Sequence, residues 1–428
     1  MLATARIQES LLGSSAVPKR HNWHTHAAGG TLSRGLPSND KKQAEFKLEL
    51  VTTREGFDAL ESEWNKLFED CGRDVHLFQN FNWIWHWANH YLPRDSTSDS
   101  SHSLYIVTGR KAGQLALVCP FVKQRRGGIT TLSFAGDPVS QYGDVLLDET
   151  RGGRELLASA WAFITAQSGA DVVALRKVRA DSNLAQLLAG SDARVTDRQF
   201  APFLDLASAP DFQTYEQRYS GKARKNRRRL HRRLEDRGPA SLSVLTGSER
   251  AGDMAALSIT MKRAWLKMRG LISPALANPA TRAFFAAIAA DSQRPVGAVV
   301  TTLTSRGEAA AINVAFDCKG RRAAHILVYA LKFERLGTGQ ILIEQCLRDA
   351  FKDGIGVYDL LAPGDAYKLD WADGGVEVFD WSQGLTLRGR AFATVYLGYG
   401  RAKLKHAALA ASQFKRNFLN RIEGSNKA

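Results

Sequence analysis

The stretch GTGQILIEQCLRDAFKDGIGVYDLLAPGDAYK, from Gly337 to Lys368, decides the fold. A Gly-x-Gly turn opens a segment whose apolar residues recur at helical spacing, and a short apolar strand and a Tyr-Lys pair follow. A helix N-terminus presents unpaired N–H groups, and glycine lets a ligand approach the backbone, so such a turn can bind a pyrophosphate. The other interpretation is a tight corner before a buried helix, which the pattern taken alone favours.

The turn matches neither of two common nucleotide-binding motifs. No Gly-Lys-Ser/Thr follows it, so it is not a P-loop. We interpret the preceding segment, residues 325–336, as a helix or loop and not a clear strand. No acidic residue stands at the later spacing that a dinucleotide fold requires.

The composition indicates a globular chain of two to three domains. The chain has 428 residues, of which 44% are hydrophobic and 24% charged, so core-building residues are ample. Its formal net charge of +15 favours an acidic partner, which could be nucleic acid, a polyphosphate or an anionic membrane surface. No stretch approaches the roughly 20 apolar residues that span a bilayer. We expect a cytoplasmic protein, with peripheral membrane contact as an open alternative.

Cysteine and histidine usage predicts no metal site. The four cysteines form no Cys-x-x-Cys pair, and each lies in an apolar segment: Cys71, Cys119, Cys318 and Cys346. We therefore expect reduced thiols, without disulfides or zinc. We interpret residues 1–44 as a disordered tail whose three clustered histidines are solvated.

The order of elements predicts a mixed α/β fold used twice. In each half, helices precede a strand hairpin, and a further helix and strand follow it. We assign residues 45–205 to an N-terminal domain and residues 206–385 to a C-terminal domain. Residues 386–428 form a basic, amphipathic helical extension.

A basic helix is predicted at residues 221–238, near the start of the second domain. From Lys222 to Arg237 it holds nine Lys or Arg against two acids, with one narrow apolar stripe. A helix of this kind is typical of a connector that lies on a domain surface. Binding of a polyphosphate or RNA is the alternative.

Four ordered segments resemble the GNAT acyltransferase superfamily, and within it the CelD-like acetyltransferase branch. The chain is also similar to the tandem GNAT folds of FemABX-type transferases. The segments span about residues 46–385 and are FQNFNWIWHW (78–87), LSFAGDPVSQYGDVLLD (132–148), RKNRRRLHRRLEDRG (224–238) and the stretch from Gly337 to Gly374. The resemblance implies two tandem GNAT-like acyl-CoA N-acyltransferase domains around a mixed sheet. It also implies a link to cellulose or exopolysaccharide biosynthesis.

The resemblance implies direct acyl transfer from acetyl-CoA or another acyl-CoA to an amine, without a metal. The strand of residues 310–317 is the candidate for pairing with the amide arm of CoA. The implied pyrophosphate cradle consists of Arg335, Gly337, Thr338, Gly339, Gln340 and Ile341. One departure is Glu334, which stands where the family has Gln or Arg and would repel a phosphate.

The same resemblance assigns reaction roles. Asp317 and Asp359 are candidates for the base, and Tyr367 for the proton donor to the departing thiolate. Lys368 either takes part in catalysis or holds a phosphate or an acceptor carboxylate. Gln141, Tyr142 and Asp144 are candidates for the acceptor pocket.

Two other functions stay open. A FemABX-like transferase would use aminoacyl-tRNA, which the basic helix and the net charge would suit. A degenerate GNAT-fold pair would bind a partner without catalysis, and Glu334 is the residue that favours this alternative.

Overall fold

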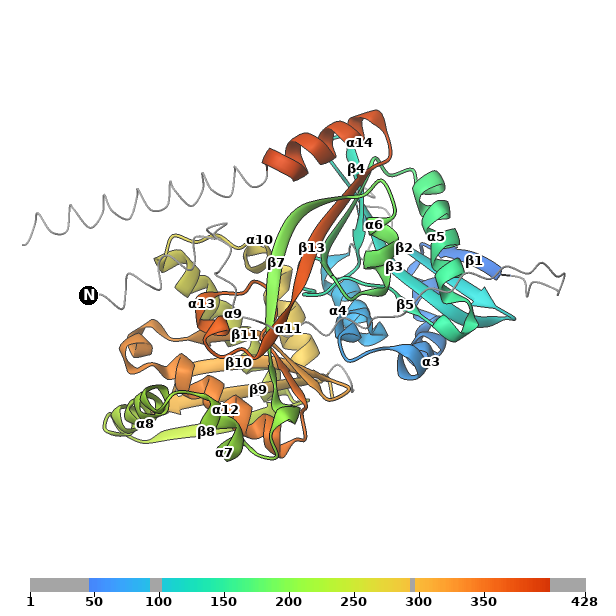
Figure 1. Cartoon of the computed structure of the whole chain (residues 1–428). Coiled ribbons are helices and arrows are strands. Elements are labelled where there is room, and N and C mark those ends of the chain that lie inside the picture. The colour runs from blue at the N-terminus through green and yellow to red at the C-terminus, as the bar shows by residue number, and fades with distance from the viewer. Residues whose placement is uncertain (1–45, 93–101, 293–296, 401–428) are drawn as a thin grey trace, which may run out of the picture.

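The computed structural model describes residues 46–92, 102–292 and 297–400, in which one mixed sheet runs through both halves of the chain (Figure 1). The sheet has 13 strands in the order β1-β2-β3-β4-β6-β13-β7-β12-β11-β10-β9-β8, with β5 paired to β3. The strands are β1 Phe46–Val51, β2 His102–Lys111, β3 Gln114–Arg126, β4 Ile129–Phe134, β5 Leu146–Leu147, β6 Val172–Arg179, β7 Arg194–Asp205, β8 Ala240–Thr246, β9 Ala298–Ser305, β10 Glu308–Cys318, β11 Arg321–Tyr329, β12 Val357–Asp359 and β13 Gly374–Gly384.

Helices cover the sheet. The α-helices are α2 Arg54–Asp58, α3 Glu61–Cys71, α4 Phe81–Tyr91, α5 Gly153–Gln167, α6 Asn183–Ala189, α7 Phe212–Tyr215, α8 Gly221–Glu235, α9 Glu249–Met268, α10 Pro274–Ala277, α11 Ala280–Ala290, α12 Thr338–Lys352, α13 Ala366–Leu369 and α14 Leu387–Phe392. A short 3-10 helix, η5 (Leu331–Leu336), joins β11 to α12, and a π-helix, η6 (Ala393–Gly400), follows α14. The tail predicted for residues 1–44 and the extension beyond residue 400 lie outside the described residues.

The mixed α/β class with a repeated unit is confirmed. The predicted hairpin of two long strands is β9 and β10, and the basic helix is α8. The interpretation of residues 325–336 as a helix or loop was wrong over its first part. Strand β11 runs to Tyr329 and pairs with β10, and only η5 separates it from the Gly-x-Gly turn.

The two halves, residues 46–205 and 206–385, share their last strands. Strand β13, from the end of the second half, lies between β6 and β7 of the first half and pairs antiparallel with both. Strand β7 in turn pairs with β12 of the second half. Figure 1 shows β7 and β13 as two long neighbouring strands that join the halves. The sheet therefore continues across the predicted domain boundary.

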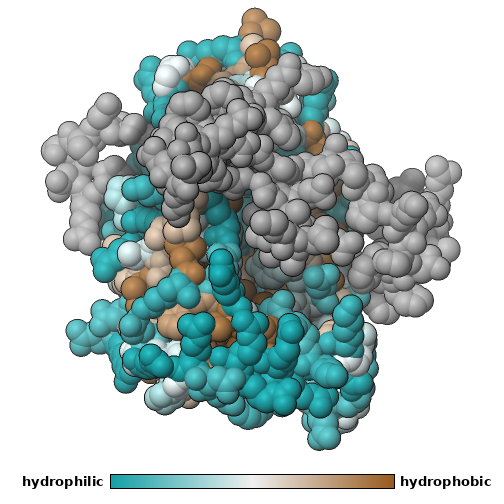
Figure 2. Space-filling model, turned by 90° about the vertical axis from the view of Figure 1, so that its left-hand side faces the viewer, coloured by the Kyte–Doolittle hydropathy of each residue, from teal (hydrophilic) through white to brown (hydrophobic). Residues whose placement is uncertain are grey.

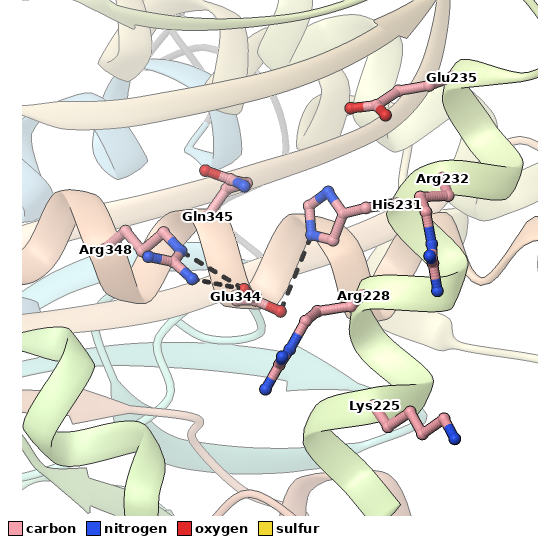
Figure 3. Close-up of a pocket in the computed structure, with 8 residues that line it drawn as sticks. All are labelled: Lys225, Arg228, His231, Arg232, Glu235, Glu344, Gln345 and Arg348. Carbon is pink, nitrogen blue, oxygen red and sulfur yellow. Dashed lines mark hydrogen bonds and ion pairs between the residues drawn. The ribbon is translucent and has the colours of Figure 1, made fainter.

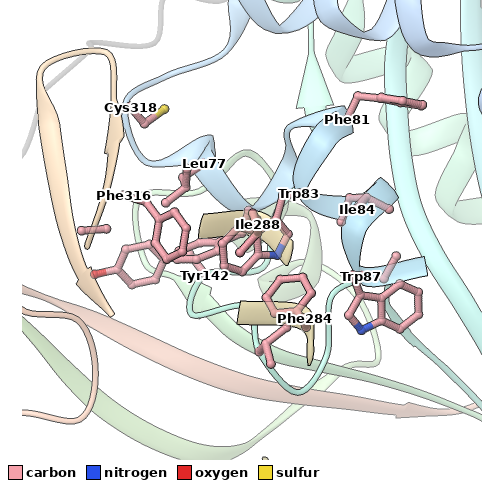
Figure 4. Close-up of a cluster of buried hydrophobic side chains, with 14 of the residues drawn as sticks. Leu77, Phe81, Trp83, Ile84, Trp87, Tyr142, Phe284, Ile288, Phe316 and Cys318 are labelled. Atoms are coloured by element: carbon pink, nitrogen blue, oxygen red, sulfur yellow. The ribbon is translucent and has the colours of Figure 1, made fainter. Parts of the chain in front are cut away.

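One apolar core also crosses that boundary. Trp83, on α4, is fully buried, and its ring lies edge-on to Phe284 at 5.2 Å and to Phe316 at 5.1 Å, measured between centroids. Its indole N–H donates to Ser140 Oγ at 2.9 Å. Figure 4 shows these rings closing around Trp83 from elements of both halves. Of the three tryptophans on α4, Trp83 and Trp87 are buried and Trp85 is partly buried.

We predict that the halves unfold together and that Trp83→Ala weakens both. Removing this ring leaves a cavity in a core that both halves share, so the free energy of unfolding should fall by about 3–5 kcal/mol. Urea denaturation followed by circular dichroism measures it. Trp85→Ala, the same change at a partly buried site of the same helix, should cost less. Two resolved transitions in the wild-type protein would contradict the shared core.

Candidate functional site

A gap in the sheet lies between β11 and β12. The two strands pair in parallel only between Arg321–Ala323 and Val357–Asp359. Beyond Ala323, no strand among the described residues pairs with β11 on its β12 side. Residues 324–329 therefore present a free strand edge to which an extended amide chain can add.

This edge corrects the expectation for residues 310–317. Strand β10 pairs with β9 on one side and with β11 on the other along most of its length. Its N–H and C=O groups are used within the sheet, so it has no edge to offer a ligand. The edge that could pair with an extended amide chain belongs instead to its neighbour β11.

A β-bulge marks the start of the free edge. The register between β10 and β11 shifts so that Val314 faces Ile326 and Ala315 faces Ala324, which leaves His325 as the extra residue. His325 Nε2 lies 2.6 Å from the carbonyl oxygen of Val139, so we assign its proton to Nε2. Burial lowers the pKa of His325 to about 4, which keeps the ring neutral. Bulges are common beside functional sites, because they redirect side chains.

The free edge leads into the Gly-x-Gly turn. Gly337 is in the left-handed region with φ +69°, and α12 begins at Thr338. As the first two residues of the helix, Thr338 and Gly339 have N–H groups without a partner inside it. The N–H of Gln340 instead donates to the carbonyl of Gly337 at 2.9 Å. The N–H groups of Thr338 and Gly339 therefore have no partner within the helix; Thr338 is buried and Gly339 is partly exposed.

The other residues expected at the cradle differ in exposure. Arg335 and Gln340 are exposed, whereas Thr338 and Ile341 are buried. The hydroxyl of Thr338 is buried without a hydrogen-bond partner among the described residues. A side chain at Gly339 would approach the ring of Tyr329 to 3.3 Å. The turn thus combines an exposed cation with a partly exposed glycine.

Glu334 does not stand as a bare negative charge at this turn. Its carboxylate forms an ion pair with Arg269 and accepts a hydrogen bond from the hydroxyl of Tyr329 at 3.2 Å. The guanidinium of Arg269 also stacks on Trp265, 4.0 Å from the ring centroid. The neighbouring cation offsets the repulsion of a phosphate that the sequence suggested.

Helix α8 packs directly on the turn. A side chain at Gly337 would come within 2.7 Å of Leu230, so the close approach of the two elements requires glycine there. Leu230 and Leu234 are buried in the core of the second half, as the predicted apolar stripe requires, and Arg227 is buried beside them. The side chains of Lys225, Arg228, Arg229, Arg232 and Arg233 are exposed.

A groove between α8 and α12 is lined mainly by cations and centres on Glu344 (Figure 3). Glu344 accepts a hydrogen bond from Arg348 at 2.8 Å and lies 3.8 Å from His231 and 3.4 Å from Arg227. Burial would raise the pKa of Glu344, but hydrogen bonds from His231 and Arg348 lower it to about 2. Glu344 therefore anchors the basic helix on α12.

The first half has a matching glycine but no gap. Gly152 precedes α5 in the left-handed region with φ +72°, as Gly337 precedes α12. Strands β4 and β6 pair only at residues 131–132 and 172–173, so they also part early. Here, however, the chain after β4 returns along β6: Gly143 forms a parallel bridge with Val178, and its N–H donates to the carbonyl of Lys177 at 3.0 Å. The chain's own loop fills the gap.

A buried carboxylate joins this loop to the second half. Asp359, at the end of β12, accepts hydrogen bonds from the hydroxyl of Tyr142 at 2.9 Å and from the backbone N–H of Leu361 at 2.9 Å. Arg321 donates to its other oxygen at 3.0 Å. Burial raises the pKa of Tyr142, and the charge of Asp359 raises it further, so the phenol stays protonated. Both expected residues lie at the gap, where they form a junction between the halves.

The other residues expected in the acceptor pocket lie near this junction. Gln141 accepts a hydrogen bond from the ammonium of Lys177 at 2.6 Å. Asp144 is buried, lies 3.0 Å from His76 and accepts from the N–H groups of Asn183 and Leu184 at the start of α6. Asp144 thus anchors a helix, whereas Gln141 lies beside a buried lysine.

Asp317 does not lie at the turn. It pairs with Arg322, at 2.7 and 2.8 Å, and Arg322 also reaches Asp353 just beyond the last turn of α12. Fifteen helical residues separate Asp353 from Gly337, which is about 22 Å along the axis. The hairpin thus holds Asp317 at the end of α12 opposite the cradle.

Tyr367 and Lys368 lie on α13, after the gap. Tyr367 is 42% exposed, and partial desolvation raises the pKa of the phenol. Lys368 is buried, and its ammonium donates to the carbonyls of Leu361 at 2.9 Å and Pro363 at 3.0 Å. Burial lowers the pKa of Lys368 to about 8. Figure 2 shows the face that carries α8 and α13, where apolar side chains gather at the centre among hydrophilic ones.

The site also holds two residues that the sequence interpretation missed. His325 and Lys177 acquire their roles from contacts with Val139 and Gln141, which lie far from them in sequence. A possible signal for His325 was its position in an apolar run that leads into a glycine turn. Nothing in the sequence around Lys177 distinguishes it from an ordinary strand lysine.

Within the described residues, no group of three or more metal-ligating side chains occurs, and no helix is long and apolar enough to cross a membrane. All four cysteines are free, and three of them are buried: Cys119, Cys318 and Cys346.

Comparisons with known proteins agree with this geometry. A family model described as an acetyltransferase (GNAT) domain matches residues 221–369. The solved structure of FemX matches with a TM-score of 0.54 and 8% identity, covering 78% of this chain and 98% of that one. A conserved protein of unknown function from Bacteroides thetaiotaomicron matches with a TM-score of 0.50 and 12% identity, covering 78% and 99%. No curated protein matches. Residues 221–369 are thus similar to an acetyltransferase (GNAT) domain, and the fold of the chain is similar to that of FemX.

We predict that Glu344→Gln destabilises the protein at neutral pH and not in acid. The folded-state pKa of Glu344 is about 2 against an ordinary 4.5, so the carboxylate contributes about 3 kcal/mol above pH 4.5. That contribution is lost as the pH falls from 4.5 towards 2. Urea denaturation of both proteins at pH 7 and pH 2 measures the difference. Glu235→Gln, an exposed glutamate of the same groove, should leave stability unchanged, and a Glu344→Gln deficit that persists at pH 2 would contradict the ion pair.

Proposed function

We propose that the protein is an acyl-CoA-dependent N-acyltransferase, most simply an acetyltransferase, with one active site in its second half. The observation that carries the proposal is the continuity of two features. The free edge of β11, residues 324–329, runs through η5 into the left-handed Gly337 and the first N–H groups of α12, which have no partner within that helix. In the described part of the first half, the equivalent gap is filled.

The two features suit the two ends of an acyl-CoA. The amide arm of CoA would pair with the edge of β11 as an added strand. Its pyrophosphate would lie at the N–H groups of Thr338 and Gly339, where the helix dipole favours negative charge. Arg335 is the exposed cation at this turn, and Arg269 offsets the charge of Glu334.

The reaction would form a bond between the amine nitrogen and the acyl carbon and break the bond between that carbon and sulfur. The departing thiolate takes up one proton, and the attacking nitrogen loses one. Tyr367 is the candidate for the first transfer, because a phenol can donate a proton and this side chain is 42% exposed on α13, just after the gap. Asp359 is a poor acceptor for the second proton, since Arg321 and Tyr142 already donate to it. We propose that this proton leaves to water and that Lys368 positions the loop after β12.

A second candidate is transfer from an aminoacyl-tRNA. The exposed cations of α8 lie on the helix that contacts the turn, and the net charge is +15. The fold is also similar to that of FemX. A tRNA bound by several phosphates would show a steep fall in affinity with salt. A weaker dependence is expected for acyl-CoA, which presents fewer phosphates.

The biological setting remains part of the proposal. The link to cellulose or exopolysaccharide biosynthesis rests on the resemblance to the CelD-like branch alone. Four free cysteines suit a reducing compartment, so we place the activity in the cytoplasm.

We predict micromolar binding of acetyl-CoA, measured by calorimetry, and its loss in Gly339→Asp. The new carboxylate would stand at the second residue of α12, where it repels a pyrophosphate but favours the helix. Affinity should therefore fall at least about 100-fold, or about 3 kcal/mol, while the thermal unfolding temperature holds.

Gly221→Asp is the matched control, because it places the same charge at the start of α8, where nothing lies within 4 Å of a side chain. It should bind acetyl-CoA as the wild type does. If the wild type binds no acetyl-CoA at millimolar concentration, the acyl-CoA proposal fails, and titration with tRNA across salt concentrations becomes the deciding measurement.

A further inference from the structure

A lysine of the first half holds a backbone conformation that is rare for its residue type. Lys177 lies in the middle of β6 with φ +56°. Opposite it, the register of β13 shifts between Phe379 and Trp381, and the carboxylate of Asp380 accepts the N–H of Lys177 at 2.9 Å. Residues other than glycine persist in this region where the surroundings hold them, and they gather at functional sites. The bulge turns the side chain of Lys177 towards the loop that fills the first half's gap.

Lys177 and Lys368 have similar surroundings on the two sides of the junction. Lys177 Nζ donates to Gln141 Oε1 at 2.6 Å and to the carbonyl of Ser140 at 3.3 Å. Lys368 Nζ donates to two carbonyls of the loop after β12. The hydrogen bond between Tyr142 and Asp359 joins these two loops directly.

Neither ammonium contacts a counter-ion. An ammonium has three N–H donors, and the oxygens named above account for two of them on each lysine. No carboxylate of the described residues lies within 4 Å of either nitrogen. Asp137 and Asp380 act on Lys177, but both pair with Arg176. Asp365 and Asp359 act on Lys368, and Asp359 pairs with Arg321. Burying a cation that has no paired carboxylate costs free energy, so an anion from outside the chain would stabilise both ammonium groups.

Neighbouring cations add to this positive potential. Burial lowers the pKa of Lys177 to about 8, and the charges of Arg176 and Lys368 contribute to the shift. Lys177 and Lys368 both act on the pKa of His325, which burial mainly depresses. A third ammonium, that of Lys262, donates to the carbonyl of Leu327 at 3.1 Å on the same strand as the free edge.

We propose that Lys177 and Lys368, one from each half, bind an anionic group of the acceptor, so that the acceptor is an amine bearing a carboxylate or a phosphate. The assignment of the anion to the acceptor rests on the proposed function, whereas the anion site itself does not. In this arrangement the first half contributes a residue to the active site of the second half. The strained Lys177 would then serve specificity, since a glycine would hold the bulge without strain.

The first test measures anion binding without acyl-CoA. Calorimetry with inorganic phosphate and with acetate should show millimolar binding by the wild type. Affinity should be at least tenfold weaker in Lys177→Met and in Lys368→Met, and largely restored in Lys177→Arg. Lys66→Met is the matched control: its side chain is 73% exposed on α3, so binding should be unchanged. Equal binding by the wild type and Lys177→Met, or none by the wild type, would overturn the proposal.

A stability measurement separates binding from loop support. Lys177→Gly removes the side chain and also relieves the left-handed strain, so it should unfold at a temperature no lower than Lys177→Met does. It should nevertheless lose the anion to the same extent. If Lys177→Gly binds phosphate and acetate as the wild type does, the ammonium is not the ligand and the proposal fails.

The second test asks which substrate carries the anion. With acetyl-CoA as donor, the wild type should show a lower KM for glycine than for glycinamide, or for phosphoethanolamine than for ethanolamine. That preference should vanish in Lys177→Met with little change in the KM for acetyl-CoA. If Lys177→Met instead raises only the KM for succinyl-CoA, the anion belongs to the donor and the acceptor assignment falls. Absence of all acyl transfer would sink the proposed function, while calorimetry would still decide on the anion site.

Discussion

The carboxylate of Asp359 stands where both halves and both edges of the gap meet. It is almost fully buried, and a charge in that position is stable only when it is fully paired. Its partners come from three places: Tyr142 from the first half, Arg321 from the start of β11, and the backbone of Leu361 just after β12. Arg179 adds a further cation, stacked 4.7 Å from the ring centroid of Tyr142. The point at which β11 and β12 separate therefore depends on Asp359. The position of the Tyr142 loop opposite the gap depends on the same side chain.

This junction gives the two copies of the fold different tasks. Both have a left-handed glycine before a helix and a parallel strand pair that parts early. In the first half, the loop 135–143 fills the opening, and its Gly143 leaves no room for a side chain against Phe134. That same loop contacts the second half through Val139, which lies 2.6 Å from His325, and through Tyr142, which donates to Asp359. The loop that fills the opening in the first half therefore also lies beside the gap in the second half.

The sequence predicts the features that depend on local periodicity and misses those that depend on distant contacts. The Gly-x-Gly turn, the hairpin of β9 and β10, and helix α8 follow from spacing within a few residues. Strand β11 was missed because Ile326 to Leu331 is a continuous apolar run, which fits a buried strand as well as a helix. The hydrogen bonds that distinguish Lys177 come from residues nearly 40 positions away and from Asp380, about 200 positions away. No local sequence pattern therefore marks it.

Asp317 shows a different kind of error, because a signal was present. The hairpin turn at Lys319-Gly320 places residue 317 opposite residue 322, and Arg322 pairs with it there. Cross-strand pairs of opposite charge are ordinary sheet contacts, so register alone predicts that this carboxylate is occupied. The expectation of a base at this position considered the end of the strand and omitted the residue across the turn.

The exposed and the buried cations of this protein have different effects on a charged ligand. The exposed cations of α8 lie in water, where salt screens them beyond about 8–10 Å, so they serve to attract a polyanionic donor towards the turn. The ammonium groups of Lys177 and Lys368 are screened much less, because burial removes water and lowers the local dielectric. In the proposed anion site, a ligand group interacts with these two charges with little screening, so its own charge decides whether it binds. Surface charge thus governs how fast a substrate arrives, and buried charge governs which substrate stays.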